Sequence, residues 1–292
     1  MNTLNKISVC YLARFESKKS FQGDLEKLNK FLASYKKYKS GIEHTLWVIV
    51  KGNQELKAVS ILKNIDIKMR ILVVEDSGFD LGSYTNFAKL IRPEWLFLLN
   101  SNSEIMCDDW LLKFWKIAQT NKLSALGSMA SFGSYSDGGS VDFYKIRSKN
   151  IWCYLRQIRD ILNRFKYSRL FPKYPNPHIR TNALLVKSED WLLYFTDKKI
   201  ETKLDCYKFE SGNDSFYNFI VNKYGNFGIV GRDMVLRFKN EWYFNGAFRT
   251  PLQDDYLLVS DNQTRTYSQS NNPLFRERLQ FESWRRVDFN GT

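Results

Sequence analysis

The sequence predicts an α/β fold with a doubly wound, mostly parallel sheet, and three observations lead to this prediction. Short apolar runs alternate with segments whose apolar residues recur at helical spacing, which is the order of strands and helices in such folds. The run at residues 95–99 is apolar throughout, as strands covered on both faces are. It ends in Asn100, Ser101 and Asn102, so polar side chains arrive at the carboxyl edge of a sheet, where α/β proteins hold ligands.

The first half of the chain supplies most of the predicted sheet. Apolar runs predict strands at residues 7–12, 46–50, 71–74, 95–99 and 124–129. Apolar residues at helical spacing predict helices at residues 25–35, 56–62, 84–91 and 111–118. Arg92 and Pro93 end the third helix because proline lacks a backbone N–H, and Asp108 or Asp109 caps the fourth. Strands joined in this way by helices run parallel to one another.

The second half of the chain is less regular. Residues 133–139 are rich in Gly and Ser and predict a loop, while the prolines of residues 171–177 predict an extended segment. Strand character returns at residues 181–187 and 227–230. Helical spacing recurs at residues 151–165, 216–224 and 274–281, and the second of these helices closes at Gly225.

The length and composition fit a folded protein with a large core. The chain has 292 residues, of which 43% are hydrophobic and 16% aromatic, which excludes a disordered protein. We expect one main domain over residues 1–235, with a basic helical insertion at about residues 145–175. Residues 236–292 are expected to form a C-terminal extension packed on that domain.

Signals for disulfides, zinc and membrane insertion are weak. The four cysteines are scattered and predict free thiols in a reducing compartment, and two histidines make an imidazole-based zinc site unexpected. No apolar run reaches the roughly 18 residues of a membrane-spanning helix, and the N-terminal apolar run is too short for a secretory signal. We expect a cytoplasmic protein.

Several segments together resemble a known family. Residues 7–9, 73–80 and 98–102 resemble the strand ends of GT-A glycosyltransferases of the family 2 type, and residues 171–183 and 261–264 resemble a bacterial polysaccharide-assembly branch. The resemblance implies a GT-A-like fold with an acceptor-side extension. It also implies transfer of a sugar from a nucleotide-sugar donor, with UDP as the expected nucleotide, to a growing bacterial surface glycan. An inverting single displacement is implied by this analogy as well.

The resemblance assigns acidic residues to the donor. An acid after the third strand contacts the donor nucleotide in this family, and Glu75, Asp76 and Asp80 occupy the matching positions. A carboxylate can accept two hydrogen bonds from uracil or from ribose hydroxyls. In the alternative, Asp76 or Asp80 caps the next helix, with Gly78 and Gly82 in the turn before it.

Asn100, Ser101 and Asn102 lie where the family has Asp-x-Asp, whose carboxylates hold a divalent cation on the donor diphosphate. Neutral amide oxygens bind Mg²⁺ or Mn²⁺ more weakly, so Asn102 is only a weak candidate ligand. Transfer without a metal would need Arg180, Lys187 or another basic residue to neutralise the diphosphate. In the alternative, the amides of this strand end only bind loop backbone.

Two carboxylates are candidates for the catalytic base. Asn213 and Asp214 open a predicted helix that closes at Gly225, as an acidic pair does in the family. This match places Asp214 where a base takes the proton of the acceptor hydroxyl. Glu210 is the second candidate, and Asp214 can instead be an N-cap or first-turn acid.

A further polar group follows the proline-rich segment. His178 and Asn182 are candidates for contact with the acceptor or a phosphate, and Arg180 is a candidate for donor binding because arginine binds phosphate bidentately. His178 can equally be a structural hydrogen-bonding group beside the prolines.

The net charge of +13 favours an anionic partner, and much of it falls between residues 145 and 173. A basic helix at residues 151–166 can lie on an anionic membrane near a lipid-linked glycan acceptor, at the inner face of the plasma membrane, or can be merely solvated. Nucleic acid is not favoured because no nucleic-acid module is recognisable. The alternatives to a transferase are a basic nucleic-acid-binding protein and a catalytically inactive GT-A scaffold.

Overall fold

A seven-stranded sheet forms the centre of the protein. The computed structural model describes residues 6–136, 166–244 and 246–285. The strands lie in the order β10-β6-β9-β4-β1-β2-β3. Their bounds are β1 (Ile7–Arg14), β2 (Thr45–Lys51), β3 (Arg70–Val73), β4 (Trp95–Leu99), β6 (Ala125–Gly127), β9 (Leu184–Lys187) and β10 (Gly228–Ile229).

The strand directions confirm the predicted mostly parallel, doubly wound sheet. β1 pairs in parallel with β2 and β4, β2 pairs in parallel with β3, and β6 pairs in parallel with β10. β9 is antiparallel to both of its neighbours, β4 and β6. Because the chain leaves β1 toward β2 and β3 and returns to place β4 on the other side, the order reverses at β1 and β4.

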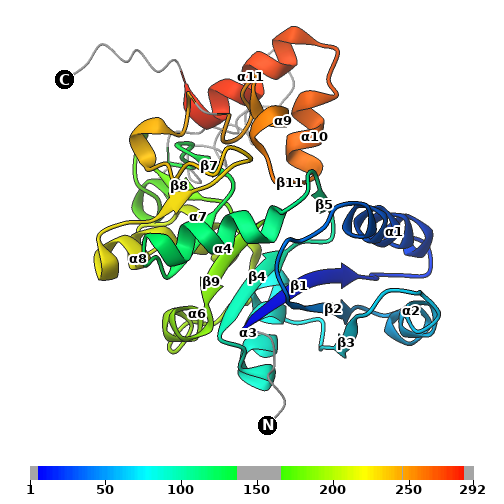
Figure 1. Ribbon diagram of the computed structural model, residues 1–292. Helices are drawn as coiled ribbons and strands as arrows, with labels where there is room; N and C mark the ends of the chain where they lie inside the picture. Colours follow the sequence, from blue (N-terminus) through cyan, green and yellow to red (C-terminus); the bar gives the residue numbers. More distant parts are fainter. Residues whose placement is uncertain (1–5, 137–165, 245, 286–292) are drawn as a thin grey trace, which may run out of the picture.

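Both faces of this sheet are covered, which explains the unbroken apolar runs. Side chains alternate along β1, with Cys10 and Leu12 in one buried cluster and Val9 and Tyr11 in the other. One face packs against α1 (Phe21–Lys37), α2 (Glu55–Leu62) and α4 (Trp110–Thr120). The other face packs against α3 (Phe79–Ile91), α6 (Ser188–Tyr194), α7 (Lys203–Ser211) and α8 (Phe216–Tyr224) (Figure 1).

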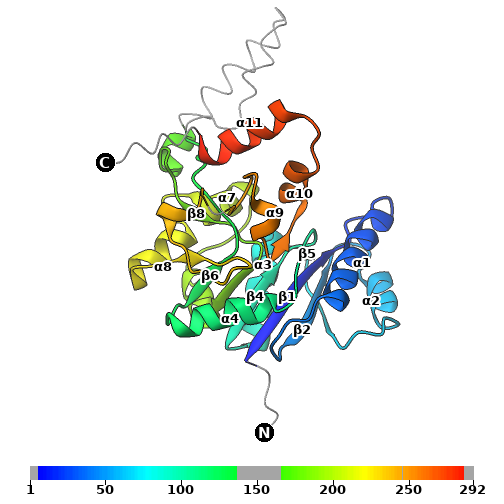
Figure 2. The same cartoon turned by 45° about the horizontal axis from the view of Figure 1, so that its top comes forward.

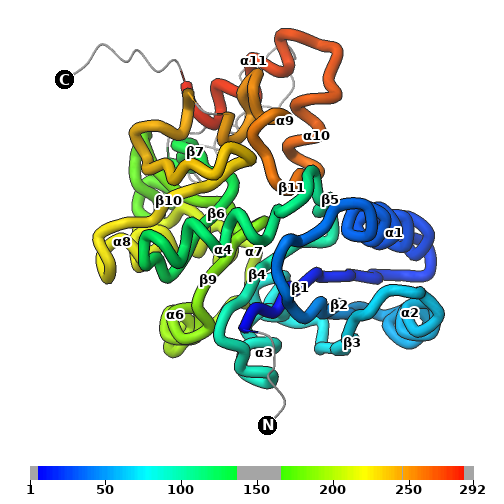
Figure 3. The backbone as a smooth tube through the Cα atoms, viewed as in Figure 1, coloured from blue at the N-terminus to red at the C-terminus, as the bar shows by residue number. Residues whose placement is uncertain are grey.

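Two short strand pairs connect later parts of the chain to the ends of the sheet. β5 (Glu104–Ile105), which follows β4, pairs with β11 (Val259–Ser260), and the two lie side by side in Figure 3. β7 (Ala130–Ser131) pairs with β8 (His178–Ile179). These pairings bring segments that are distant in the sequence to the carboxyl end of β4.

The C-terminal part of the chain consists of short helices. They are η2 (Lys239–Glu241), α9 (Gln253–Tyr256), α10 (Asn262–Ser268) and α11 (Pro273–Trp284). Figures 1 and 2 show α9, α10 and α11 together, and Figure 1 shows β11 beside α9 and α10. Trp284 ties the last helix down, since it is fully buried and its Nε1 donates to the Phe248 carbonyl at 2.6 Å. The proposed boundary near residue 235 stays a prediction.

Most predicted elements of the sheet and its helices are present. The helix predicted at residues 274–281 is confirmed as α11, and the segment at residues 171–177 contains no helix. The helix predicted at residues 151–165, with most of the basic insertion, lies outside the described residues. In the described part of the chain, the helices lack the combined length and apolar character needed to cross a bilayer.

The turn between β3 and α3 is held by a buried lysine. Lys51, at the end of β2, has a fully buried side chain whose Nζ donates to the Phe79 carbonyl at 2.7 Å and lies 3.1 Å from Asp76. Gly78, which precedes α3, has a φ of +65°, a conformation that glycine adopts without steric cost. Lys51 therefore fixes the position at which α3 begins.

Replacing Lys51 tests this anchor. Lys51→Met keeps most of the buried length of the side chain but removes the ammonium group, so we expect the free energy of unfolding to fall by about 1–3 kcal/mol. Urea denaturation measures the change. Lys63→Met is the control, because Lys63 is exposed and its substitution should change the free energy of unfolding by no more than about 0.5 kcal/mol. Equal effects of the two substitutions would contradict the role assigned to Lys51.

Candidate functional site

A cavity of about 480 Å³ lies at the carboxyl end of β4. Its size is within the range of small-molecule sites. The start of α3, the segment around β8, helix α7 and the C-terminal part of the chain complete its walls. The predicted site residues that line it are Asp80, Asn100, Ser101, Asn102, His178, Arg180, Asn182 and Glu210.

Two of the acids predicted for the donor do not line this cavity. Glu75 is exposed, and Asp76 forms ion pairs with Lys51 at 3.1 Å and with Arg14 at 3.7 Å. Asp80 does line the cavity, from the first turn of α3. Of the three acids expected to bind the donor, only Asp80 therefore lines the cavity. Asp76 instead forms ion pairs with Lys51 and Arg14.

Asp214 also lies away from the cavity, which is a correction to its expected place beside the acceptor. It is exposed, and its backbone carbonyl accepts a hydrogen bond from Tyr194 Oη at 2.7 Å. Nor is it the N-cap of α8, because Ser215 occupies that position and accepts a hydrogen bond from the Asn218 backbone. Of the two predicted bases, only Glu210 reaches the cavity.

Three side chains from different elements hold the carbonyl groups at the end of β4. Tyr84 Oη donates to the Leu99 carbonyl at 2.8 Å, and Tyr11 Oη donates to the Ser101 carbonyl at 3.0 Å. Arg265 Nη2 donates to the Asn102 carbonyl at 2.9 Å. Because its backbone is fixed in this way, the strand end can present side chains without moving.

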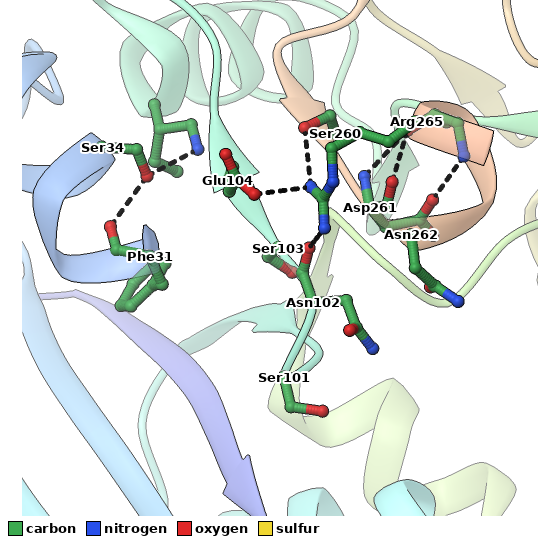
Figure 4. Close-up of polar contacts among 12 residues, drawn as sticks. Phe31, Ser34, Ser101, Asn102, Ser103, Glu104, Ser260, Asp261, Asn262 and Arg265 are labelled. Atoms are coloured by element: carbon green, nitrogen blue, oxygen red, sulfur yellow. Dashed lines mark hydrogen bonds and ion pairs between the residues drawn. The ribbon is translucent and has the colours of Figure 1, made fainter. Parts of the chain in front are cut away.

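Figure 4 shows how Arg265 joins α10 to this strand end. Its guanidinium also lies 3.0 Å from Glu104 and 3.2 Å from the hydroxyl of Ser260, so it connects β5, β11 and α10. The side chains of Ser101 and Asn102 point away from Arg265 in this view. These two side chains line the cavity and do not contact the guanidinium of Arg265.

The side-chain oxygens of Asn100 and Asn182 already accept hydrogen bonds at the strand end. Asn182 Oδ1 accepts from the Asn100 backbone at 3.0 Å and from Ser103 Oγ at 2.6 Å. Asn100 Oδ1 accepts from the Asn102 backbone at 2.8 Å. The alternative structural role therefore holds for the side-chain oxygens of Asn100 and Asn182.

The hydrogen bonds of these amides affect whether the strand end could bind a divalent cation. Mg²⁺ and Mn²⁺ prefer anionic oxygens, but the strand end offers neutral groups, of which Asn100 Oδ1 is occupied. Among the described residues, no group of three or more His, Cys, Asp or Glu side chains could hold a metal ion. The strand end itself therefore offers a hard divalent cation only neutral oxygens.

Glu210 and Arg180 form an ion pair inside the cavity. Glu210 Oε1 lies 3.1 Å from Arg180 Nη1, with side chains 21% and 18% exposed. Neither Glu210 Oε1 nor Arg180 Nε has a hydrogen-bond partner among the described residues. Burial lowers the pKa of Arg180, but Glu210, Asp261 and Tyr135 raise it by more, so the net shift is upward. Arg180 therefore stays charged beside Glu210.

His178 is neutral in this environment. Its Nδ1 lies 2.9 Å from the Asn176 carbonyl, which can only accept, so Nδ1 carries the proton and Nε2 keeps a lone pair. Burial lowers the pKa of His178 and Arg180 lowers it further, while Glu210 and the Asn176 hydrogen bond raise it. The net shift is downward, and the buried imidazole is an acceptor at the cavity wall.

The C-terminal part of the chain adds cavity residues that the sequence did not single out. They include Phe248, Arg249 and Glu282. No local pattern marks them, because each reaches the cavity only through long-range packing. Asp261 is different, since it belongs to a segment noted in the sequence, and it caps α10 by accepting from the backbone of Gln263 and Thr264 at 2.9 Å each.

Comparisons with known proteins show a likeness to solved structures. No family model matches the chain, and no curated protein matches it. Among solved structures, mouse xyloside xylosyltransferase 1 in its apo form is similar, with a TM-score of 0.37 and 10% sequence identity. The likeness covers 77% of this chain and 85% of that one.

The state of His178 gives a prediction for pH. Its pKa is expected below the ordinary value of about 6.5, because burial disfavours the charged imidazole. Between the folded and unfolded pKa values the unfolded chain binds more protons, so the free energy of unfolding falls as the pH drops below 6.5.

Proton NMR titration of the two histidines checks this prediction, with His178→Gln identifying the signal. That variant should also show a smaller loss of stability between pH 6.5 and the folded pKa. A midpoint at or above 6.5 for His178 would contradict its placement as a buried neutral group.

Proposed function

We propose that the protein is a glycosyltransferase that moves a sugar from a nucleotide-sugar donor, with UDP as the nucleotide, to a growing bacterial surface glycan. One observation carries the proposal: the polar end of β4, beside the point where the strand order reverses, shares a cavity with Glu210 and Arg180. Such crevices are where open α/β sheets bind ligands. The resemblance of the strand ends to GT-A enzymes is consistent with this reading.

In the proposed reaction, Glu210 acts as the general base of an inverting single displacement. It takes the proton of an acceptor hydroxyl while that oxygen bonds to the anomeric carbon, and the bond from this carbon to the nucleotide diphosphate breaks. Two features support this role: the carboxylate lines the cavity, and its Oε1, which lies 3.1 Å from Arg180 Nη1, has no hydrogen-bond partner within the described part of the chain. His178 Nε2 is a second acceptor at the same wall.

We further propose that transfer proceeds without a divalent cation, because the strand end provides neutral oxygens. The proposed acceptor is a glycan or lipid-linked glycan. Contact with an anionic membrane surface through residues 151–166, at the inner face of the plasma membrane, is part of the same proposal, and those residues lie almost wholly outside the described part.

A second candidate function has one observation in its favour. The neutral strand end, with Asn100 Oδ1 turned back onto its own loop, suits a protein that binds a nucleotide sugar without transferring it. Both candidate functions require binding of a nucleotide sugar, but only the transferase would turn it over.

Ligand binding tests the proposal first. In EDTA, UDP should raise the melting temperature, because a ligand that binds only the folded state stabilises it. A single-stranded oligonucleotide of equal phosphate content should have little effect at physiological salt. A screen of nucleotide sugars for hydrolysis or transfer, with and without EDTA, then separates the transferase from the inactive scaffold. Stabilisation by the oligonucleotide but not by UDP would overturn the proposal, and complete loss of activity in EDTA would overturn its metal-independent form.

Substitution of the two predicted bases tests the mechanism. Glu210→Gln should lower kcat by about a hundredfold or more, because general base catalysis contributes on that scale, while UDP still binds. Asp214→Asn should keep the activity, since Asp214 is exposed outside the cavity. If Asp214→Asn loses activity and Glu210→Gln retains it, the base is assigned to the wrong carboxylate.

A further inference from the structure

Two arginines of the cavity lie over the same aromatic ring. The guanidinium carbons of Arg180 and Arg249 are 4.7 Å and 4.9 Å from the centre of the Phe248 ring. Their side chains are only 18% and 15% exposed, and both line the cavity. We call Arg180 and Arg249 the arginine pair. Because like charges in a partly buried site repel, such a pair is stable only with anions around it.

The protein's own carboxylates supply part of that negative charge. Arg180 is paired with Glu210 at 3.1 Å, and Arg249 Nη1 lies 3.2 Å from Glu282. The other carboxylate oxygen of Glu282 pairs with an arginine of α11, so Glu282 is shared. Burial lowers the pKa of Arg249 and the charge of Arg180 lowers it further, against the opposing effects of Glu282 and Asp261. The charge of Arg249 is thus less fully compensated than that of Arg180, whose pKa is raised.

The cavity also retains unused hydrogen-bond donors. The Nε groups of Arg180 and Arg249 are buried and have no hydrogen-bond partner among the described residues. The same holds for Nδ2 of Asn182, another residue of the cavity lining. Buried donors normally have partners because an unmade hydrogen bond is costly. Donors without partners on residues that line one cavity, among them two guanidinium groups, indicate a ligand with several anionic oxygens.

We propose that the arginine pair binds a phosphate oxyanion. A guanidinium group binds phosphate through two parallel hydrogen bonds, and two such groups match the charge of a diphosphate or of a phosphate monoester. The source of the phosphate rests on the proposed function: it is the diphosphate of the donor or a phosphate carried by the acceptor. If it is the donor's, the electron pair of the breaking glycosidic bond stays on the diphosphate oxygen, whose charge the arginine pair offsets without a metal.

Calorimetric titration of the full chain with inorganic pyrophosphate in EDTA tests this site. The wild-type chain should bind it, and Arg249→Gln should weaken the affinity about tenfold or more, because a charged hydrogen bond is lost. Arg249→Lys keeps the charge but loses the planar fork, so an intermediate affinity is expected. Arg276→Gln removes the same charge from an exposed position of α11 outside the cavity and should leave the affinity unchanged. Circular dichroism confirms that each variant is folded.

Repeating the titration in saturating UDP identifies the source. Loss of pyrophosphate binding assigns the arginine pair to the donor, whereas retained binding assigns it to a phosphorylated acceptor. A wild-type chain that does not bind pyrophosphate, or equal affinities for wild type, Arg249→Gln and Arg276→Gln, would overturn the site whatever the nucleotide screen shows. Binding of pyrophosphate through Arg249, with no binding of any nucleotide sugar, would keep the site and remove the proposed function.

Discussion

The contact between Asn182 and the end of β4 decides where the cavity forms. Asn182 Oδ1 holds both the Asn100 backbone and the Ser103 hydroxyl, and the next residue, Ala183, donates its backbone N–H to the Leu98 carbonyl at 2.9 Å. Ala183 adopts a φ of +56°, a conformation that costs energy for a residue with a Cβ, and this contact keeps it there. The chain therefore turns at one defined point between β8 and β9.

The direction of β9 determines which residues this contact brings to the end of β4. Because β9 is antiparallel to β4, its first residues lie beside the last residues of β4, and not at the opposite edge of the sheet. The residues just before β9 are then delivered to the polar end of β4, which is how Arg180 and His178 enter the same cavity as Asn100 and Asn102. A parallel strand at this place would have sent them to the other side of the molecule.

The sheet was predictable because burial on both faces leaves a direct mark on the sequence. The apolar runs of β1, β2 and β4 and the helical spacing of α1, α3 and α4 needed no tertiary information. Helices α6, α7 and α10 were not predicted as helices, because they are short, with 7, 9 and 7 residues, and so show little helical periodicity. For α7, the sole local signal is the capping box formed by Thr202 and Asp205.

The site was predictable only where a strand end fixes it. Asn100–Asn102 follow β4 directly, so their place at the sheet edge was foreseeable. The choice between Glu210 and Asp214 was not, because it depends on how α7 and α8 pack: Glu210 belongs to the end of α7, and Asp214 lies in the turn between the two helices. Arg249 carried no signal at all, since its place depends on a C-terminal segment tied down by Trp284 and by the pairing of β5 with β11.

The pairing of β5 with β11 also has a consequence for folding during synthesis. The seven-stranded sheet can form before the cavity is complete, because β11 follows the last strand of that sheet in the sequence. During synthesis the N-terminal part of a chain emerges first, and the last strand of the large sheet, β10, ends at Ile229. Residues 248–283, which supply one wall of the cavity, leave the ribosome later. A nascent chain can thus assemble its whole sheet before this wall of the cavity exists, and the wall is in place only when β11 has reached β5.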